Sequence, residues 1–425
     1  MKKMSVLRDK SLVLFTILIV MITGCSQPES GFLPEWKEGI LDIHQIATGR
    51  GNAAFLMLPD GTTMLIDAGD LGDRVQLPQE IMPELPNGSK LPGEWIADYI
   101  RHFSAPLKNN GALDYVQLTH YHTDHIGGVA SNAKTIAGRN YLLSGIAEVA
   151  EYVAIDKIID RNWPAFDYPS RARVEQATST LENLQEFYAY QQGRGTKIER
   201  FVPGSNQQFV LKKNPARYNN FTIRNIYSSG MIWTGEGEGS RSLFPPVEVF
   251  EESGRYPSEN MCSSVIKLSY GKFDYFSGGD ITGTTGRDNI VWSDVETPVA
   301  RLVGPVEVAL LNHHGYSDAI NENFISLTRP QAFIIPVWDF YHPQPEILSR
   351  MVDKQYYPNN RYIFATGFVS GNKERLGELG DNIHQPCGHI VTRVYPGGDK
   401  YQIFVLDAGS TDYKIIYSSP ILEAN

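Results

Sequence analysis

The sequence predicts an α+β fold in which a mixed β-sheet has helices between its strands. Short apolar runs bounded by turn residues recur along the chain from Ile40, as expected for strands. Two longer stretches instead place apolar residues at helical spacing. The composition agrees, because 42% hydrophobic and 20% charged residues in a chain of 425 are typical of a packed globular protein and exclude collagenous, coiled-coil and disordered classes.

The predicted elements follow one another without a linker that would divide residues 40–425 into two domains. Helices are predicted at 91–106 and 174–192 because their apolar residues share one face. Residues 135–258 are the least regular part and are interpreted as an elaboration of the same domain. The predicted strands are 40–46, 53–58, 62–67, 114–119, 265–270, 273–277, 306–311, 331–338, 361–366, 389–395 and 401–408.

The N-terminal segment is predicted to be a targeting segment rather than part of the folded domain. A basic stretch precedes the apolar run 12–22, which is too short to span a bilayer and is typical of a signal peptide. The run ends in Ile-Thr-Gly-Cys25 and resembles a bacterial lipobox, which implies that residues 1–24 are removed and that Cys25 is lipidated. Residues 25–39 would then tether the protein to a membrane of the bacterial cell envelope, outside the cytoplasm. A secreted protein with a cysteine near its cleavage site is the alternative.

Charge and cysteine content limit the partners. A net charge of −10 repels polyphosphate, so a general nucleic-acid coat requires a local basic strip to override it. Residues 194–224 are basic with interleaved aromatic residues, and we interpret them as a solvated hairpin face, with a surface for a polyanionic strand as the alternative. Cys262 and Cys387 are interpreted as buried small hydrophobes rather than a disulfide. No feature of the sequence predicts an oligomeric state.

The residues that carry chemistry follow the strand predicted at 114–119. The segment His120-Tyr-His122-Thr-Asp124-His125 places three imidazoles and a carboxylate within six residues. Side chains two residues apart share a face in extended backbone, so His120 and His122 can converge on one ion, while Asp124 and His125 serve a second ion or complete the first. A histidine-rich surface loop is disfavoured, because that many polar groups at a strand end are costly unless something coordinates them.

These motifs resemble those of the metallo-β-lactamase-fold hydrolases. The resemblance rests on HxHxDH followed by Gly-Gly, on Leu-Ile-Asp67-Ala-Gly-Asp upstream and on Ser-Gly-Gly-Asp280 downstream, and it covers roughly 40–345. It implies a four-layer αβ/βα sandwich with an insertion between the HxHxDH segment and Asp280. The strings ATGRGNAAFLML, LLNHHG and YHPQPEIL occur in the order found in the nuclease-like domain of the bacterial competence DNA-uptake channel and in phosphorylcholine esterases, to which the chain is similar.

The resemblance implies a site for one or two divalent metal ions. His120 and His122 would bind the first ion, Asp124 and His125 the second, and Asp280 would bridge the two. Zinc is the expected metal, and manganese or a single-metal state is the alternative. Asp124 is also a candidate catalytic residue.

The remaining roles fall on residues outside the HxHxDH segment. His314 is favoured as the last metal ligand and His313 as its catalytic or supporting neighbour. His342 is a third candidate, either catalytic or a ligand, with a surface histidine before a proline turn as the alternative. Asp67 would orient a liganding histidine, as carboxylates beside metal sites commonly do.

The sequence departs from the family pattern at one ligand. A third histidine for the first ion is expected between the HxHxDH segment and Asp280, and the chain has no histidine between His125 and His313. Asn260 falls where that ligand is expected, and an amide oxygen is a weaker donor than imidazole. Glu259 and Cys262 are the alternatives.

The predicted function is metal-dependent hydrolysis, with phosphodiesters as the favoured substrates. These would be small molecules or polymers at the bacterial cell surface, nucleic acid among them. Hydrolysis of another ester or of a lactam is an alternative, because the fold alone does not determine the substrate. A binding lipoprotein with a weakened metal site is the alternative from another class, and the missing histidine favours it.

Overall fold

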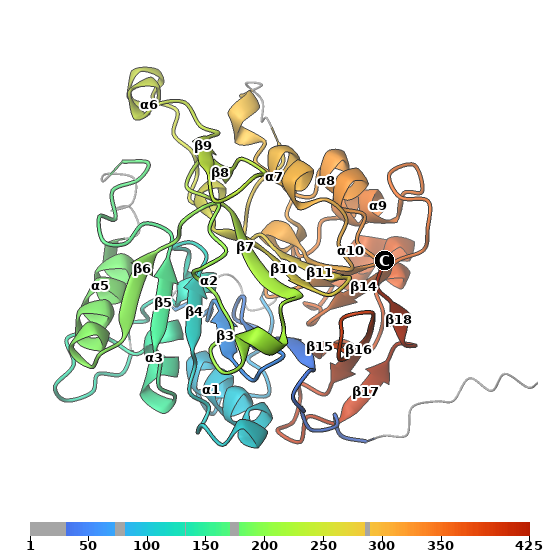
Figure 1. The fold of residues 1–425 in the computed structure, drawn as a ribbon, viewed down its shortest axis with the longest axis horizontal. Helices are drawn as coiled ribbons and strands as arrows, with labels where there is room; N and C mark the ends of the chain where they lie inside the picture. The colour runs from blue at the N-terminus through green and yellow to red at the C-terminus, as the bar shows by residue number, and fades with distance from the viewer. Residues whose placement is uncertain (1–30, 73–80, 132, 171–177, 285–289) are drawn as a thin grey trace, which may run out of the picture.

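Two β-sheets pack face to face, and helices cover the outer face of each (Figure 1). The computed structural model describes residues 31–72, 81–131, 133–170, 178–284 and 290–425. The described part of the chain therefore has the four-layer αβ/βα sandwich that the sequence predicts, and the predicted fold class is confirmed.

The first sheet is mixed. Its strands follow the order β17-β16-β15-β1-β2-β3-β4-β5-β6, and β18 pairs with β16. The steps from β3 to β6 are parallel, while the steps among β15, β1, β2 and β3 are antiparallel. The strand bounds are β1 Leu41–Gln45, β2 Ala54–Met57, β3 Thr63–Ile66, β4 Tyr115–Leu118, β5 Lys157–Asp160, β6 Lys197–Arg200, β15 His389–Val394, β16 Lys400–Leu406, β17 Ile415–Ser418 and β18 Leu422–Glu423.

The second sheet has the order β14-β13-β12-β11-β10-β7-β8-β9. Its steps from β11 to β14 are parallel, so each sheet contains one parallel block at one of its ends. The strand bounds are β7 Phe221–Ser228, β8 Met231–Trp233, β9 Ser240–Ser242, β10 Val265–Tyr270, β11 Phe273–Ser277, β12 Val308–Leu310, β13 Ala332–Ile335 and β14 Tyr362–Ala365.

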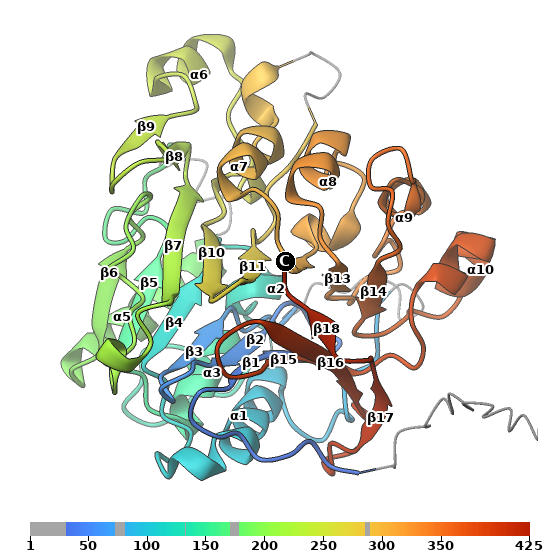
Figure 2. The same cartoon turned by 45° about the vertical axis from the view of Figure 1, so that its right-hand side comes forward.

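Helices connect the parallel strands, because a parallel step requires a crossover. Helices α1, α3 and α5 follow β3, β4 and β5 and pack on the first sheet, whereas α7, α8 and α9 follow β11, β12 and β13 and pack on the second (Figure 2). The helix bounds are α1 Pro92–Phe103, α2 Thr123–Ile126, α3 Gly145–Tyr152, α5 Thr178–Gly193, α6 Val247–Ser253, α7 Glu296–Val303, α8 Glu322–Thr328, α9 Pro345–Val352 and α10 Asn372–Leu376.

The core is divided into three apolar clusters by the alternation of side chains along the strands. In β2, Phe55 and Met57 belong to the cluster under α1, α3 and α5, while Ala54 and Leu56 belong to the cluster between the sheets. This division follows from the two-residue period of a strand, which sends neighbouring side chains to opposite faces. A third cluster lies between the second sheet and α7, α8 and α9.

All predicted strands and both predicted helices are present; the strands predicted at 265–270 and 273–277 have the predicted bounds, and the other elements have shifted ends. Residues 174–177 of the second predicted helix lie outside the described residues. Strand β13 ends at Ile335, three residues before its predicted end, because Pro336 cannot donate to the ladder. The stretch 135–258 is more regular than predicted, since it supplies β5 and β6 to the first sheet and β7, β8 and β9 to the second.

The predicted signal segment 1–24, Cys25 and the first part of the 25–39 tether lie outside the described residues. Within the part of the chain that the structure describes, no helix is long and apolar enough to cross a membrane. Cys262 and Cys387 are both free thiols. Cys262 is fully buried, as the sequence predicts, whereas Cys387 is only partly buried.

Candidate metal centre

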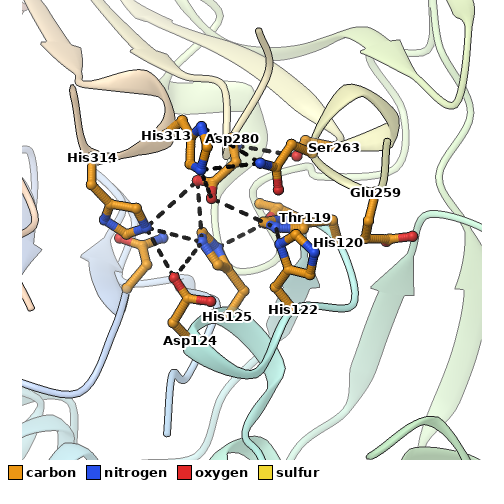
Figure 3. Close-up of polar contacts among 12 residues, drawn as sticks. Thr119, His120, His122, Asp124, His125, Glu259, Ser263, Asp280, His313 and His314 are labelled. Carbon is orange, nitrogen blue, oxygen red and sulfur yellow. Dashed lines mark hydrogen bonds and ion pairs between the residues drawn. The ribbon is translucent and has the colours of Figure 1, made fainter. Parts of the chain in front are cut away.

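The chemistry-bearing residues gather at one edge of the sandwich because both parallel blocks end there. Asp67 follows β3 and His120 follows β4 in the first sheet, whereas Asp280 follows β11 and His314 follows β12 in the second. The carboxyl ends of neighbouring parallel strands lie at the same edge of a sheet, which is where open α/β sheets bind ligands. Figure 3 shows the side chains from the two sheets pointing toward one another.

The first candidate ligand group consists of His120, His122 and Asp280. Their ligand atoms lie within 4.8 Å of one another. His120 Nε2 is 3.1 Å from His122 Nδ1 and 3.7 Å from Asp280 Oδ2 (Figure 3). Burial lowers the pKa of both imidazoles, so both rings are neutral at pH 7 and keep a lone pair for a metal.

The second candidate group consists of Asp124, His125, Asp280 and His314, all buried. His125 Nε2 lies 3.1 Å from Asp280 Oδ1 and 3.3 Å from His314 Nε2, and His314 Nε2 lies 3.2 Å from Asp124 Oδ2. Asp280 belongs to both groups, with one oxygen facing each. This is the position predicted for a bridging carboxylate.

The charges of the second group fit a cation. Burial raises the pKa of Asp124 and Asp280, but His125 and the other imidazoles outweigh burial, and both carboxyl groups have a pKa well below the ordinary value. Burial lowers the pKa of His125, but the negative charges of Asp280 and Asp67 raise it by more, so the net shift of this pKa is upward. Two buried carboxylates thus require compensation by a positive charge, and nitrogen and oxygen ligands in this number are those that zinc and similar ions prefer.

Asp67 and Thr119 contact the Nδ1 atoms of the histidines, on the side of each ring away from the candidate ligand groups. Asp67 Oδ2 lies 2.7 Å from His125 Nδ1, and the same oxygen accepts a hydrogen bond from Thr119 Oγ1 at 2.8 Å. Thr119 Oγ1 in turn lies 3.2 Å from both His120 Nδ1 and His125 Nδ1. These contacts leave Nε2 of His120 and His125 facing the candidate ligand groups, a geometry that fits the orienting role predicted for Asp67.

His313 lies at the rim of the site in a loop with unusual backbone. His313 and His314 have φ of 45° and 52°, a left-handed region that non-glycine residues rarely adopt and that is often found at functional sites. His313 Nδ1 is 2.6 Å from Asp318 Oδ1, and its Nε2 is 4.0 Å from Asp280 Oδ2. The structure therefore places His314 in the ligand group and His313 beside it.

His342 lies behind the ligands and belongs to neither group. Its ring stacks on that of His314 with centroids 4.6 Å apart, and it is buried rather than exposed before its proline. The neighbouring Trp338 donates from Nε1 to Asp124 Oδ2 at 2.9 Å. His342 and Trp338 therefore contact a ligand each, which gives this loop a supporting position.

The three candidates for the ligand that replaces the missing histidine, Asn260, Glu259 and Cys262, differ in their contacts and burial. Asn260 is buried beside His313, with Nδ2 3.1 Å from His313 Nε2, and its Oδ1 has no hydrogen-bond partner in the described part of the chain. Glu259 is engaged elsewhere, because it accepts hydrogen bonds from the Arg161 guanidinium at 2.6 and 2.7 Å and from Tyr121 N at 2.8 Å. Burial raises the pKa of the Cys262 thiol to about 12, which disfavours the thiolate that a metal requires. An unsatisfied amide oxygen makes Asn260 the best of the three.

The basic stretch 194–224 does not form an aromatic strip. Phe201, Phe209 and Tyr218 are buried in the cluster between the sheets. The basic side chains have local partners, for example Lys212 with Asp156. This arrangement agrees with a solvated face.

Several residues that support the site were not predicted from the sequence. Thr119 is the one with a usable signal, because it directly precedes the HxHxDH segment after β4. Asp318, Trp338 and Arg161 reach the site from loops after other strands. Ser263 accepts a hydrogen bond from Asp280 N at 3.1 Å.

Comparison with known proteins gives one family match and several similar solved structures. A sequence model of the Metallo-beta-lactamase superfamily matches residues 47–153, which contain Asp67 and the HxHxDH segment. A search of curated protein sequences finds no match. The solved structures similar to this chain include a protein from Parabacteroides distasonis assigned as a metal-dependent hydrolase, with 11% identity over 76% of this chain and 92% of that chain and a TM-score of 0.33.

Two further solved structures are similar at the same level. A diphosphatase from the PhnP family is 8% identical over 84% of this chain and 98% of that chain, with a TM-score of 0.32. The short form of human tRNase Z is 10% identical over 82% of this chain and 98% of that chain, with a TM-score of 0.31.

Proposed function

We propose that the protein is a metal-dependent hydrolase that cleaves phosphodiesters. The observation that carries the proposal is the position of Asp280, which has one oxygen 3.7 Å from His120 Nε2 and the other 3.1 Å from His125 Nε2. A carboxylate shared by two groups of largely buried ligands suits a pair of divalent ions, and paired ions are common in enzymes that hydrolyse phosphate esters.

The ligands in this proposal are His120, His122 and Asp280 for one ion and Asp124, His125, His314 and Asp280 for the other. A bound divalent ion supplies Lewis acidity, which lowers the pKa of water from about 15.7 to about 7 and stabilises negative charge on the attacked group. Zinc is the expected ion and manganese the alternative.

Other residues of the chain orient the metal ligands and supply a proton to the leaving group. Asp67 fixes the ring of His125, and Trp338 fixes Asp124 through its indole N–H. His313 is the proposed proton donor to the leaving oxygen, because Asp318 holds its Nδ1 while its Nε2 points toward Asp280. A leaving alkoxide requires such a proton.

The test is a comparison of substrates with the metal-analysed protein. Bis(p-nitrophenyl) phosphate, single-stranded DNA, a phosphocholine ester and a chromogenic lactam are offered in parallel. We expect turnover of phosphodiesters, and at least a 1,000-fold loss in Asp124→Ala and His122→Ala without unfolding by circular dichroism, on the order expected when metal ligands are removed. His102→Ala, on an exposed turn of α1, is the matched control and should keep full activity. Lactam turnover without phosphodiester turnover would overturn the substrate class.

A binding protein with a weakened metal site is the second candidate, and Asn260 in place of a histidine is the observation that favours it. The same assay separates the two. Stoichiometric metal with no turnover of any ester would favour the binding protein.

We also propose that a lipid on Cys25 anchors the protein to a membrane of the bacterial cell envelope, outside the cytoplasm. The support is the lipobox-like sequence that ends at Cys25. Cys25→Ser should move the protein from the membrane fraction to the soluble fraction, and an unchanged distribution would contradict the anchor.

A further inference from the structure

Two exposed tyrosines lie beside the candidate metal centre. Tyr316 and Tyr341 are 37% and 42% exposed, and their ring centroids are 6.3 Å apart at an angle of 86°. The ring of Tyr316 lies 5.3 Å from that of His313, the proposed proton donor. Exposed aromatic rings in contact at the rim of a site leave apolar area for a ligand to cover.

The two rings are held by the loops that also position the site. Tyr316 follows the loop after β12, and its N–H donates to His313 O at 2.7 Å. Tyr341 follows β13, the parallel neighbour of β12, and its N–H donates to Asp339 Oδ1 at 2.7 Å. The rings therefore stand next to each other because their strands do, and their backbones are fixed before a ligand arrives.

We propose that Tyr316 and Tyr341 form an aromatic step that stacks a planar ring on one ester arm of the substrate. The substrates of this class are phosphodiesters with nucleobase-like arms. The inference rests on the proposed function, because His313, whose ring is next to that of Tyr316, would donate a proton to the leaving oxygen. Stacking on aromatic side chains tolerates any base, since every base has a π-face.

The charge near the step favours a planar ring over a quaternary ammonium group, which aromatic rings also bind. The Arg375 guanidinium lies 5.7 Å from the ring centroid of Tyr341 and 5.0 Å from that of Phe340. Its hydrogen bonds go to neutral acceptors, including Phe340 O and Pro343 O at 2.9 and 2.6 Å. The nearby carboxylates of Asp339 and Glu346 offset part of this positive charge, and the remainder disfavours a second cation at the step and attracts an anionic backbone.

The experiment compares a short oligothymidylate with an oligomer of the same length and charge that has tetrahydrofuran spacers in place of nucleosides. We expect the wild-type kcat/KM to be about tenfold higher for the strand with bases. Tyr316→Leu/Tyr341→Leu should reduce this ratio to near one, while Tyr316→Phe/Tyr341→Phe should retain it because the rings remain. Tyr152→Leu, at an exposed tyrosine on α3, is the matched control and should keep both the ratio and the activity.

Equal kcat/KM for the two strands in the wild type would overturn the proposal. A phosphocholine ester is measured in parallel, and a loss confined to that ester in the Leu variants would overturn the planar ring in favour of a cation. If no strand is cleaved, the proposed function fails, and the step is tested by calorimetric binding of thymidine 5′-monophosphate against deoxyribose 5-phosphate. Tighter binding of the nucleotide that is lost in the Leu variants would support the step, and equal binding of the two would overturn it.

Discussion

Asp67 and His125 are joined by a contact of 2.7 Å between Oδ2 and Nδ1, and this contact connects β3 to the metal groups. The same carboxylate accepts hydrogen bonds from Thr119 N and Thr119 Oγ1, both at 2.8 Å, and from Asn52 Nδ2 at 3.0 Å. Both oxygens of Asp67 therefore act as acceptors. Asp67 also has a φ of 60°, which aspartate and asparagine tolerate better than most residues.

Asp67→Asn tests this relationship while keeping size and backbone preference. The new amide group must point its N–H toward one of the donors, so the orientation of His125 is disturbed. We expect metal affinity to fall about 10- to 100-fold, measured by competition with a chromophoric chelator. Asp156→Asn, at an exposed partner of Lys212, is the control and should bind metal as the wild type does. Unchanged affinity in Asp67→Asn would show that His125 does not depend on Asp67.

Restoring the missing histidine should strengthen the metal site. Asn260 is 8% exposed, and its Oδ1 has no hydrogen-bond partner among the described residues. The imidazole of a histidine at this position would therefore replace an amide oxygen that lacks a partner. We expect Asn260→His to bind zinc more tightly and to retain more metal after dialysis, measured by elemental analysis, because imidazole is a better zinc ligand than an amide oxygen. The exposed Asn359→His is the control for a non-specific gain. Equal metal content in Asn260→His and the wild type would place Asn260 away from the ion.

The HxHxDH part of this site is predicted from a local pattern, whereas Asp67, Asp280 and His314, which follow other strands, are predicted only through the family resemblance. His120, His122, Asp124 and His125 follow β4 directly, so their convergence depends on local backbone alone. Trp338 and Asp318 could not be predicted, because their contacts with Asp124 and His313 depend on how loops from different strands meet. Strand β6 was missed for a related reason, since the sequence Lys-Ile-Glu-Arg of an edge strand is mostly polar and lacks the apolar run of a buried strand.

Glu296 ties together the loop that carries His313 and His314. Its Oε1 accepts from Asn312 Nδ2 at 2.8 Å and from Ile320 N at 2.7 Å, and its Oε2 accepts from Asn321 N at 2.7 Å. Glu296→Gln would set an amide N–H against one of these donors. We expect a loss of about 1–3 kcal/mol in the free energy of unfolding, measured in urea, with lower phosphodiesterase activity. Glu251→Gln, exposed on α6, should change neither quantity, and a stable Glu296→Gln variant would show that the loop does not rely on this carboxylate.

Glu148 should make the protein less stable at alkaline pH. Burial, with the nearby charges of Asp70 and Glu94, raises the pKa of Glu148 to about 8 from 4.5. The folded state therefore holds this proton more tightly than the unfolded state, and the stability that results is present at low pH and is lost as the pH rises toward about 8. Glu148→Gln imitates the neutral acid, so its advantage over the wild type in urea unfolding should grow between pH 5 and pH 9. A difference between the two proteins that stays constant with pH would contradict the shift.

His389 should have the opposite effect, a loss of stability in acid. Its ring is buried against Tyr99, with centroids 4.6 Å apart, and its Nδ1 accepts from Ala47 N at 3.0 Å. Burial lowers the pKa of His389 to about 3 from 6.5, so the unfolded state binds a proton that the folded state rejects. The stability contributed by the neutral ring is fully present above about pH 6.5 and falls as the pH approaches 3, by about 1.4 kcal/mol for each unit of the shift that is titrated.

His389→Asn isolates this contribution, because asparagine keeps an acceptor near the position of Nδ1 but has no group that titrates in this range. We expect the variant to be less stable than the wild type at pH 7, because the smaller side chain leaves a void beside Tyr99. Between pH 6.5 and pH 4, however, its free energy of unfolding should fall less steeply than that of the wild type. Any metal site contributes equally to both proteins, so the difference between the two slopes reports His389 alone, and equal slopes would show that its proton is not excluded from the folded state.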